Sequence, residues 1–482
     1  MNRVAALRTG LFWSRMGTRF LPFADAATKE MPLGRLLRLS LFQVSVGMAA
    51  VLLTGTLNRV MIVELHMSAS IVAAMVSLPL LFAPLRALIG FKSDTHRSVL
   101  GWKRVPYIWF GTLLQFGGLA LLPFALLVMT GGGDGPAVVG QIGAALAFLL
   151  VGAGMHTTQT AGLALATDLA TDETRPRVVA LMYVMLLVGM MVSALAIGRA
   201  LTDFTPTKLV QIIQAAAVLT MALNLIALWK QEARNQSATA ARDVQPPFRD
   251  AWAMFIARPR TMRLLVAVGL GTAAFSMQDV LLEPYGGQIL GMSVGATTSL
   301  TALWAMGMLA GFVWAARQLA TGADPHRLAG FGGVGGILAF LCVMFAGPLH
   351  APALLGAGAI FIGAGAGLFS VGTLTAIMAI SNADEAGGRS GLALGAWGAV
   401  QATTAGLAIV IGAFARDAVS AAAIDQRLGS TLAVPTTGYA FVYAIEILLL
   451  LGTLVTLGPL VRGHGVPSPT PSARLGLSEF PI

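Results

Sequence analysis

The chain has 482 residues, of which 56% are apolar and only 11% are charged. Soluble domains carry about 25% charged residues, so this composition excludes a water-soluble enzyme and predicts a protein that lies in a membrane. The formal net charge of +10 would suit nucleic-acid binding, but the positions of the basic residues along the chain give another explanation.

Twelve apolar runs follow one another along the chain, and each is long enough to cross about 30 Å of hydrocarbon as a helix. Because the runs are continuously apolar and do not alternate with polar residues, they are not strands of a transmembrane barrel. The predicted fold class is therefore an all-α integral membrane protein with twelve transmembrane helices. In chain order the predicted spans are 36–57, 69–91, 105–130, 137–166, 178–201, 208–229, 262–283, 296–316, 328–347, 353–381, 391–414 and 437–461.

The basic residues between these spans predict the orientation of the chain in the membrane. An even number of spans puts both termini on one side, and the segments on that side hold 25 of the 31 Lys and Arg residues. Five others lie on the opposite side, and Arg86 lies within the second span. Since basic loops stay in the cytoplasm, both termini are predicted to be cytoplasmic, and the net charge requires no nucleic-acid partner.

The longest polar stretch, residues 230–261, divides the chain into two halves. We expect it to be a cytoplasmic linker between a six-helix bundle at 36–229 and a second one at 262–461. The N-terminal segment 1–35 places apolar residues at helical spacing among arginines, which suits an interfacial helix on the cytoplasmic side. The tail 462–482 is predicted to be cytoplasmic as well.

Two loop motifs occur at corresponding places in the two halves. A D-x-H-R pattern follows the second span at 94–97 and the eighth span at 324–327. These matches predict a duplication of six spans, and the 6+6 arrangement resembles that of the major facilitator superfamily. A D-E-x-x-x-R pattern follows the fourth span and, 212 residues later, the tenth; its residues are Asp172, Glu173 and Arg177, then Asp384, Glu385 and Arg389.

The loop between the second and third spans resembles the G-x-x-x-D loop of that superfamily, with extra residues after its acid. A carboxylate at a helix end can pair with basic groups and with the dipole of a neighbouring helix, and can so hold the cytoplasmic face in one conformation. The alternative is a solvated turn that only orients the chain. The candidate gate cluster consists of the two D-E-x-x-x-R motifs together with Arg86, Gly90, Asp94, Arg97, Gly101, Lys103 and Arg104.

Three longer stretches carry a more specific resemblance. They read SDTHRSVLGWKRVPYIWFGTLLQFGGLALLPFALL at 93–127, QTAGLALATDLATDETRPRVVALMYVMLLVGMM at 159–191 and LLEPYGGQILGMSVGATTSLTALWA at 281–305. These stretches are similar to the PucC/LhaA family of purple phototrophic bacteria, also called the bacteriochlorophyll delivery family, and the likeness covers nearly the whole chain. Segment 1–35 is most similar to the LhaA branch, which serves the core antenna, whereas the PucC branch serves the peripheral antenna.

The resemblance implies a function that composition and spacing do not reveal. It implies a non-enzymatic assembly factor in the bacterial inner membrane, which assists the insertion of antenna α and β polypeptides and delivers or handles bacteriochlorophyll a. It also implies bacteriochlorophyll synthase and the membrane insertion machinery as partners, in addition to the membrane lipids that a protein of this composition contacts. No catalytic residue is predicted, since the chain has no phosphate-binding loop, dinucleotide fingerprint or His/Cys metal motif.

Given this resemblance, the fourth span offers candidate pigment-binding residues. His156 lies near the middle of the span and is the candidate axial ligand for the magnesium of a chlorin, which is the only metal role expected. Gly152 and Gly154 would leave room for a flat ligand beside it. Because magnesium prefers oxygen, Gln159 and Gln43 are further candidates through their side-chain carbonyl oxygens. The alternative is that these residues only join neighbouring helices by hydrogen bonds.

Ionisable residues within spans are costly and are therefore functional candidates. Asp279 and Glu283 lie one helical turn apart near the outer end of the seventh span, and Tyr285 follows them. Arg59 lies at the corresponding end of the first span, so these residues could form an ion pair that closes a cavity, or they could be charges at a wet interface. Glu446, about ten residues into the twelfth span, would suit the alternative function, a proton-coupled transporter of a small solute. The few polar residues of the first and tenth spans favour an apolar ligand or a protein partner instead.

Overall fold

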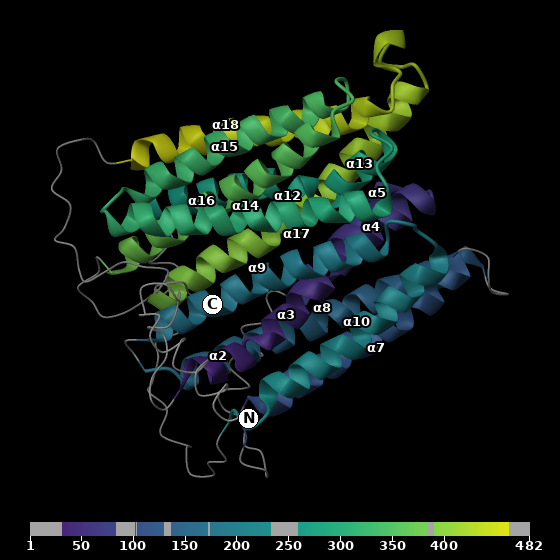
Figure 1. Ribbon diagram of the computed structural model, residues 1–482. Helices are drawn as coiled ribbons and strands as arrows, with labels where there is room; N and C mark the ends of the chain where they lie inside the picture. The colour runs from purple at the N-terminus through teal and green to yellow at the C-terminus, as the bar shows by residue number, and fades with distance from the viewer. Residues whose placement is uncertain are drawn as a thin grey trace, which may run out of the picture.

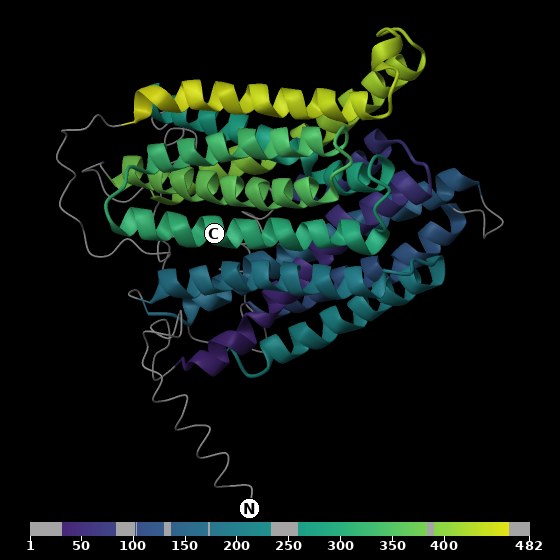
Figure 2. The ribbon, with the colours of Figure 1, turned by 45° about the horizontal axis from the view of Figure 1, so that its top comes forward.

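The chain is a helical bundle throughout the part that is described, with no strand in that part. The helices lie side by side, and the first described helix begins at the end of the bundle where the last one finishes (Figure 1, Figure 2). The all-α fold that the apolar runs predict is confirmed. The computed structural model describes residues 31–82, 102, 104–129, 136–171, 174–232, 259–382 and 390–461.

The first half begins with a span, Leu33–Glu64, in which the number of residues per helical turn changes along the helix. Its initial part is regular α-helix, and two later stretches, η2 and η3, are π-helical. The elements of this half are α2 (Leu33–Leu39), α3 (Leu41–Ala50), η2 (Val51–Thr56), α4 (Leu57–Arg59), η3 (Val60–Glu64), α5 (Ala69–Ser77), η4 (Leu78–Phe82), α7 (Val105–Met129), α8 (Ala137–Asp168), α9 (Arg175–Ala200) and α10 (Pro206–Leu228).

The second half also begins with an interrupted span, Arg260–Gln288, in which the short 3-10 helix η5 separates α12 from α13. The remaining helices of this half are long and regular. The elements are α12 (Pro259–Ser276), η5 (Met277–Val280), α13 (Leu282–Gln288), α14 (Val294–Ala320), α15 (Pro325–Ala346), α16 (Pro352–Asn382), α17 (Ser390–Ile424), η6 (Ser430–Leu432), α18 (Thr436–Leu457) and η7 (Gly458–Leu460).

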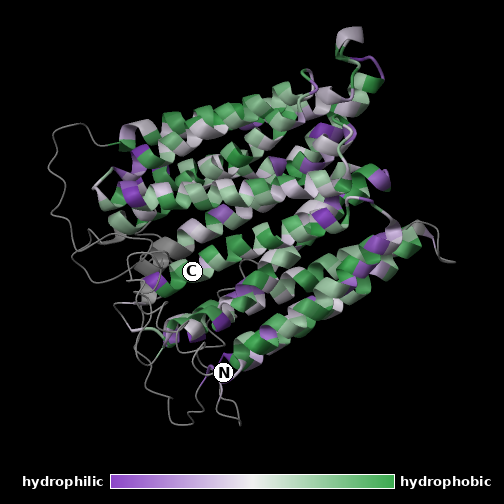
Figure 3. Cartoon of the chain, in the orientation of Figure 1, coloured by the Kyte–Doolittle hydropathy of each residue, from purple (hydrophilic) through white to green (hydrophobic). Residues whose placement is uncertain are grey.

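The protein is a multi-pass membrane protein. In the described part of the chain, eleven helical stretches are long and apolar enough to cross a membrane. The second predicted span is represented by the shorter apolar helix Ala69–Leu80, and the rest of 69–91 lies outside the described residues, so the number twelve stays a prediction. Side chains such as Phe124 and Phe414 are more than 60% exposed on the bundle surface, where lipid would cover them. Figure 3 shows hydrophobic residues along the lengths of the helices.

Several spans continue beyond their predicted ends. The eleventh was expected to end at residue 414, but α17 continues to Ile424, and the first and seventh continue to Glu64 and Gln288. Charged residues do not end α17, because Arg416 pairs with Asp417 at 2.8 Å and also donates hydrogen bonds to Gln288 and Tyr439. Apolar runs therefore underestimate a span whose polar residues find partners within the bundle.

The two ends of the bundle differ in the residues that they carry. The basic end carries Arg104, Asp168 and Gln231, and the opposite end carries Glu64 and Gln288. In Figure 1 the basic end lies at the left, near the start of α2, and the opposite end lies at the right, near α13. The distribution of basic residues predicts that the basic end is cytoplasmic.

Helix pairs within one half have counterparts in the other half. In the first half α3 packs against α9 and α10, and α7 packs against α8 and α10. In the second half α12 packs against α17 and α18, and α15 packs against α16 and α18. Between the halves, α9 packs against α14 and α5 packs against α17. Each of these pairings recurs six spans later, as a duplication of six spans would produce.

Candidate functional site

A cavity of about 460 Å³ lies between the two halves. Helices α8 and α9 line it from the first half, and α12, α14, α16 and α17 line it from the second. Aromatic side chains contribute much of its wall, notably Trp304, Trp397 and Tyr183. Its lining residues lie in the middle of these helices and toward the basic end, so the cavity occupies the core of the bundle.

The polar groups of the cavity are neutral. Amide side chains of Gln159 and Gln401 and a few hydroxyl groups line it, and no charged side chain is among the described lining residues. Gln159 Nε2 donates to Oε1 of the fully buried Gln43 at 3.4 Å, so two of the predicted glutamines meet at one edge of the cavity. Trp397 Nε1 donates to Thr373 Oγ1 at 3.2 Å, which fixes its indole ring. Such a lining suits a largely apolar ligand with a few polar acceptors.

The space expected beside His156 is filled by other helices. A Cβ atom on Gly154 would lie 2.5 Å from the backbone oxygen of Gly111 on α7, and one on Gly152 would collide with the ring of Pro79. The two glycines therefore let α7 and η4 approach α8, and the expectation that they leave room for a flat ligand is wrong. His156 is half-buried and does not line the central cavity, although Gln159, three residues further on, does. A pigment role for His156 stays a prediction.

Three of the four predicted residues at the opposite end are buried, with exposed fractions of 3% for Arg59, 4% for Glu283 and 2% for Tyr285, and Asp279 is half-buried. The interpretation of Arg59 and Glu283 as charges at a wet interface is therefore wrong. Glu283 Oε1 accepts a hydrogen bond from Thr301 Oγ1 at 2.5 Å, and Tyr285 accepts one from the backbone amide of Gly347 at 2.9 Å. The sequence did not predict this burial, because a residue near the end of a span is expected to lie close to the membrane surface.

Arg59 joins the first span to the second half. Its guanidinium forms an ion pair with Glu64, and Nη2 donates to the backbone oxygen of Met292 at 3.2 Å. The side chain also lies against Gly287, where a Cβ atom would be 3.1 Å from Nε. The predicted approach of Arg59 to the seventh span is therefore correct, but its ion-pair partner is Glu64, whereas Glu283 lies near enough to interact with it electrostatically.

Further polar contacts between the halves occur at or near the opposite end. Asn58 Nδ2 donates to the backbone oxygen of Asp279 at 3.3 Å, and the side-chain oxygen Oδ1 of Asp279 accepts from Gln278 at 2.6 Å. The hydroxyl groups of Thr56 and Thr298 lie 3.2 Å apart. The Asn58 and Thr56 contacts join α4 and η2 of the first span to the second half and close the bundle beyond the cavity, whereas the Gln278 contact lies within η5. We refer to them, together with the Arg59 contacts, as the outer closure.

At the basic end, most of the predicted gate cluster lies outside the described residues, but Arg104 and Arg177 are described. Arg104 Nε donates to Asp168 Oδ2 at 2.9 Å, and Glu232 accepts from the backbone amides of Arg104 and Val105. These contacts lie within the first half. The residues outside the described part are Arg86, Gly90, Asp94, Arg97, Gly101, Lys103, Asp172, Glu173, Asp384, Glu385 and Arg389.

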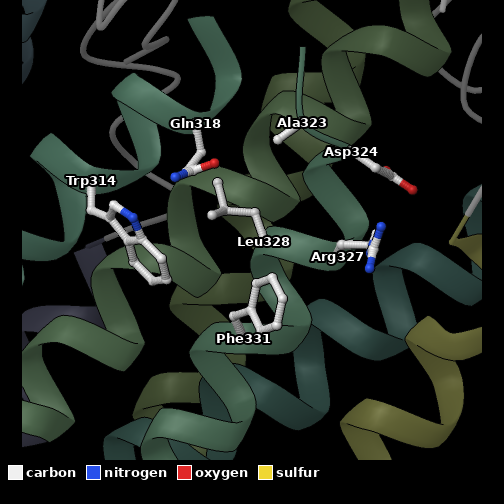
Figure 4. Close-up of a pocket in the computed structure, with 7 residues that line it drawn as sticks. All are labelled: Trp314, Gln318, Ala323, Asp324, Arg327, Leu328 and Phe331. Atoms are coloured by element: carbon white, nitrogen blue, oxygen red, sulfur yellow. The ribbon is translucent and has the colours of Figure 1, made fainter. Parts of the chain in front are cut away.

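A smaller cavity of about 270 Å³ lies between α14 and α15 at the basic end (Figure 4). Trp314 and Phe331 line one part of it with ring centroids 6.4 Å apart, and Asp324 and Arg327 line another. These last two residues belong to the D-x-H-R motif, and Asp324 caps α15 by accepting from the amide of His326 at 3.0 Å. Tryptophan and arginine at a span end are typical membrane-interface anchors, so we assign this motif a structural role.

The family of the chain follows from its sequence relatives. The family model described as PUCC protein matches residues 56–465. The chain belongs to the PUCC protein family. The match begins in the π-helical part of the first span and includes every helix that lines the cavity. The resemblance that the three sequence stretches carry is thus confirmed.

Relatives of this PUCC family member match it over most of their length, at identities from 28% to 58%. Protein PucC of Rhodovulum sulfidophilum is 58% identical over 87% of this chain and 92% of its own. An uncharacterized protein in the puhA-bchM intergenic region of Rhodobacter capsulatus is 55% identical over 96% of this chain and 97% of its own. The bacteriochlorophyll synthase 44.5 kDa chain of Rhodobacter capsulatus is 28% identical over 80% of this chain and 87% of its own.

Solved structures show the fold of this PUCC family member. A mutant of the nucleoside transporter NupG superposes with a TM-score of 0.65 at 14% identity, over 88% of this chain and 99% of that one. A bacterial homologue of the human lysosomal transporter Spinster gives the same TM-score and identity over 88% of this chain and 96% of that one. The chain therefore has the major-facilitator-type transporter fold, while at this identity the likeness carries no substrate.

Sequence reasoning missed most of the cavity wall. Trp304 and Trp397 come from α14 and α17, and Tyr183 comes from α9, so the residues that face one another are far apart in the chain. A tryptophan within an apolar run could be read only as a lipid-facing or core residue. The paired glutamines were found because amide groups are rare in spans, and that rarity was the available signal.

Proposed function

We propose that this PUCC family member is a non-enzymatic assembly factor, which handles bacteriochlorophyll and assists the insertion of light-harvesting antenna polypeptides. Its relatives named Protein PucC, at 50–58% identity over most of the chain, and its relative named as a bacteriochlorophyll synthase chain support this role. The observation that carries the proposal is the central cavity, which combines aromatic walls with neutral amides and has no charged group among its described lining residues.

The cavity residues suit a chlorin ligand chemically. Trp304 and Trp397 can cover the face of a flat conjugated ring, since aromatic rings prefer offset or edge contacts with one another. Gln159 and Gln401 offer carbonyl oxygens, which hard magnesium prefers, and amide donors for the ring carbonyl groups. A volume of about 460 Å³ lies within the usual range of ligand pockets, about 300–1,000 Å³.

The proposal includes a location and partners. The protein would lie in the bacterial inner membrane with its basic end and both termini in the cytoplasm, in keeping with the excess of basic residues there. Its two bundles at 36–229 and 262–461 would enclose the cavity, and the segment 1–35 would assign it to the LhaA branch and the core antenna. Antenna α and β polypeptides, bacteriochlorophyll synthase and the insertion machinery would be its partners.

The alternative, a proton-coupled transporter of a small solute, is favoured by one observation. Glu446 is fully buried in a span, where transporters place proton-carrying acids. Against it, the described cavity lining has no charged group that would bind a hydrophilic solute. We therefore rank it second.

Gentle purification from the native membrane tests the proposal. The absorption spectrum and the co-purifying polypeptides of the wild type are compared with those of Gln401→Leu. A matched control is Gln211→Leu, because Gln211 is an exposed glutamine on α10. We expect bacteriochlorophyll and antenna polypeptides with the wild type and the control, and much less pigment with Gln401→Leu. A wild type that carries neither pigment nor antenna polypeptides would contradict the proposal.

A further inference from the structure

Glu446 is an acid buried inside the bundle. It lies ten residues after the first residue of α18 and is fully buried. Neither of its carboxylate oxygens has a hydrogen-bond partner of normal distance and angle among the described residues. An ionised carboxylate in such a place is strongly disfavoured, because neither water nor a polar partner replaces its hydration.

The acid faces the break in the seventh span. The backbone of Gln278 and the carboxylate of Asp279, both on η5, lie close enough to interact with Glu446. η5 is a 3-10 turn between two α-helices, and the side-chain oxygen Oε1 of Gln278 is buried without a partner in the described part. Interrupted spans expose polar backbone groups inside a membrane protein, and transporters use such breaks to bind ions.

The cations near this region are engaged elsewhere. Arg59 pairs with Glu64, and Arg416 on α17 pairs with Asp417 and donates to Tyr439. From α15 the ring of Phe340 stacks against Tyr443, which is an apolar neighbour. Among the described residues, no group of three or more His, Cys, Asp or Glu could hold a metal ion. A single buried carboxyl group can bind a proton without further ligands.

A stripe of buried polar side chains on α18 leads from the opposite end to Glu446, and the hydroxyl group of Tyr443 within it has no hydrogen-bond partner among the described residues. Tyr439, Tyr443 and Glu446 follow one another at intervals of four and three residues and lie on one buried face of α18. At the outer end of the stripe, Tyr439 donates to Gln288 at 2.7 Å. The ring of Tyr285 contacts both Tyr439 and Tyr443 edge-on, with centroids 5.2 and 5.7 Å away.

We propose that Glu446 is a proton-binding site, reached from the opposite end along Tyr439 and Tyr443, and that its occupancy is linked to the outer closure. Binding converts the carboxylate and one proton to a neutral acid, and release returns the proton along the same stripe. When Glu446 and the neighbouring Asp279 are both ionised, their carboxylates repel each other. The backbone oxygen of Asp279 accepts a hydrogen bond from Asn58 of the first half. Loss of the proton from Glu446 therefore favours separation of the halves there. The proposal does not depend on the identity of the cargo.

Infrared difference spectroscopy on the purified protein in lipid nanodiscs tests the site. The carbonyl band of a buried protonated carboxyl group is followed as pH rises and after transfer to deuterated water. We expect a Glu446 component of this band in the wild type and in Asp425→Asn, a control at an exposed acid, and the loss of that component in Glu446→Gln, while the buried Glu283 contributes to all three spectra. Glu446→Asp should keep the band at a shifted position, so the site can still be tested if the glutamine variant folds poorly. Identical bands in the wild type and Glu446→Gln would overturn the proposal.

Distance measurement tests the link to the closure. Spin labels are placed at two exposed residues of the opposite end, Thr207 in the first half and Leu349 in the second, in a Cys342→Ser background. The distance in the wild type should increase as pH rises, whereas Glu446→Gln should hold the short distance at every pH. A wild-type distance that does not change with pH, or a variant that changes as the wild type does, would overturn the link.

Discussion

Ser70, at the start of α5, donates its backbone amide to Asp417 Oδ2 on α17 at 2.7 Å. The donor belongs to the second span and the acceptor to the eleventh, so this hydrogen bond joins the two halves at the opposite end. It satisfies one of the free amides at the beginning of a helix with a charged acceptor from another domain half. The outer closure is thereby extended from the first and seventh spans to the second and eleventh.

Replacement of Asp417 should loosen this end. Asp417→Ala removes a charged acceptor from the Ser70 amide, which costs about 1–3 kcal/mol. We expect faster hydrogen exchange in the amides of α5, by about five- to a hundredfold, measured by mass spectrometry. Asp425→Ala, at an exposed acid of the same region, should leave α5 unchanged. Equal exchange in both variants would show that the Ser70 contact does not hold α5.

Gly154 should resist the smallest enlargement. Gly154→Ala places a methyl group against the backbone of α7, which forces the helices apart and costs about 1–3 kcal/mol. Gly117→Ala is the control, because Gly117 on α7 has open space around it and alanine favours helix. Thermal unfolding in detergent should show a lower Tm for the first variant and an unchanged or higher Tm for the second. The opposite order would refute the close packing of α7 and α8.

Pigment content should separate Gln159 from His156. Gln159 lines the cavity and His156 does not, so Gln159→Leu should lose more bound pigment than His156→Leu. Loss of a polar contact worth about 1–3 kcal/mol corresponds to roughly a five- to hundredfold lower affinity. The ratio of bacteriochlorophyll to protein in each purified variant measures the difference. A larger loss with His156→Leu would return the ligand role to the histidine.

Glu232 should stabilise the start of α7. Glu232→Ala leaves the first amides of this helix without their side-chain acceptor, and loss of a cap costs about 1 kcal/mol. Glu232→Gln keeps an acceptor oxygen and should retain most of the stability. Tm values of the two variants decide the matter, and a glutamine variant as unstable as the alanine variant would show that charge, not capping, is what matters.

The helices were predicted well from the sequence because each transmembrane span is marked by a local run of apolar residues. It placed Arg59 and Glu283 near one another because both lie at corresponding span ends. It could not show that they are buried, since depth in the bundle depends on other helices. The same limit explains Gly152 and Gly154, whose apparent free space is occupied by Pro79 and α7. Six helices from both halves form the cavity, and no local sequence pattern shows that these helices come together.

The wide turns of the first span have a mechanical consequence. A π-helical turn holds one residue more than an α-helical turn, so Val51–Thr56 and Val60–Glu64 keep surplus chain within an unbroken helix. If one such turn tightens to α-helix, the residues beyond it rotate by about 100° without any unfolding. Arg59 lies between the two stretches, and its side chain would swing away from Met292 and Gly287. A change from π-helical to α-helical winding in the first span would thus rotate Arg59 and release its guanidinium group from its partners.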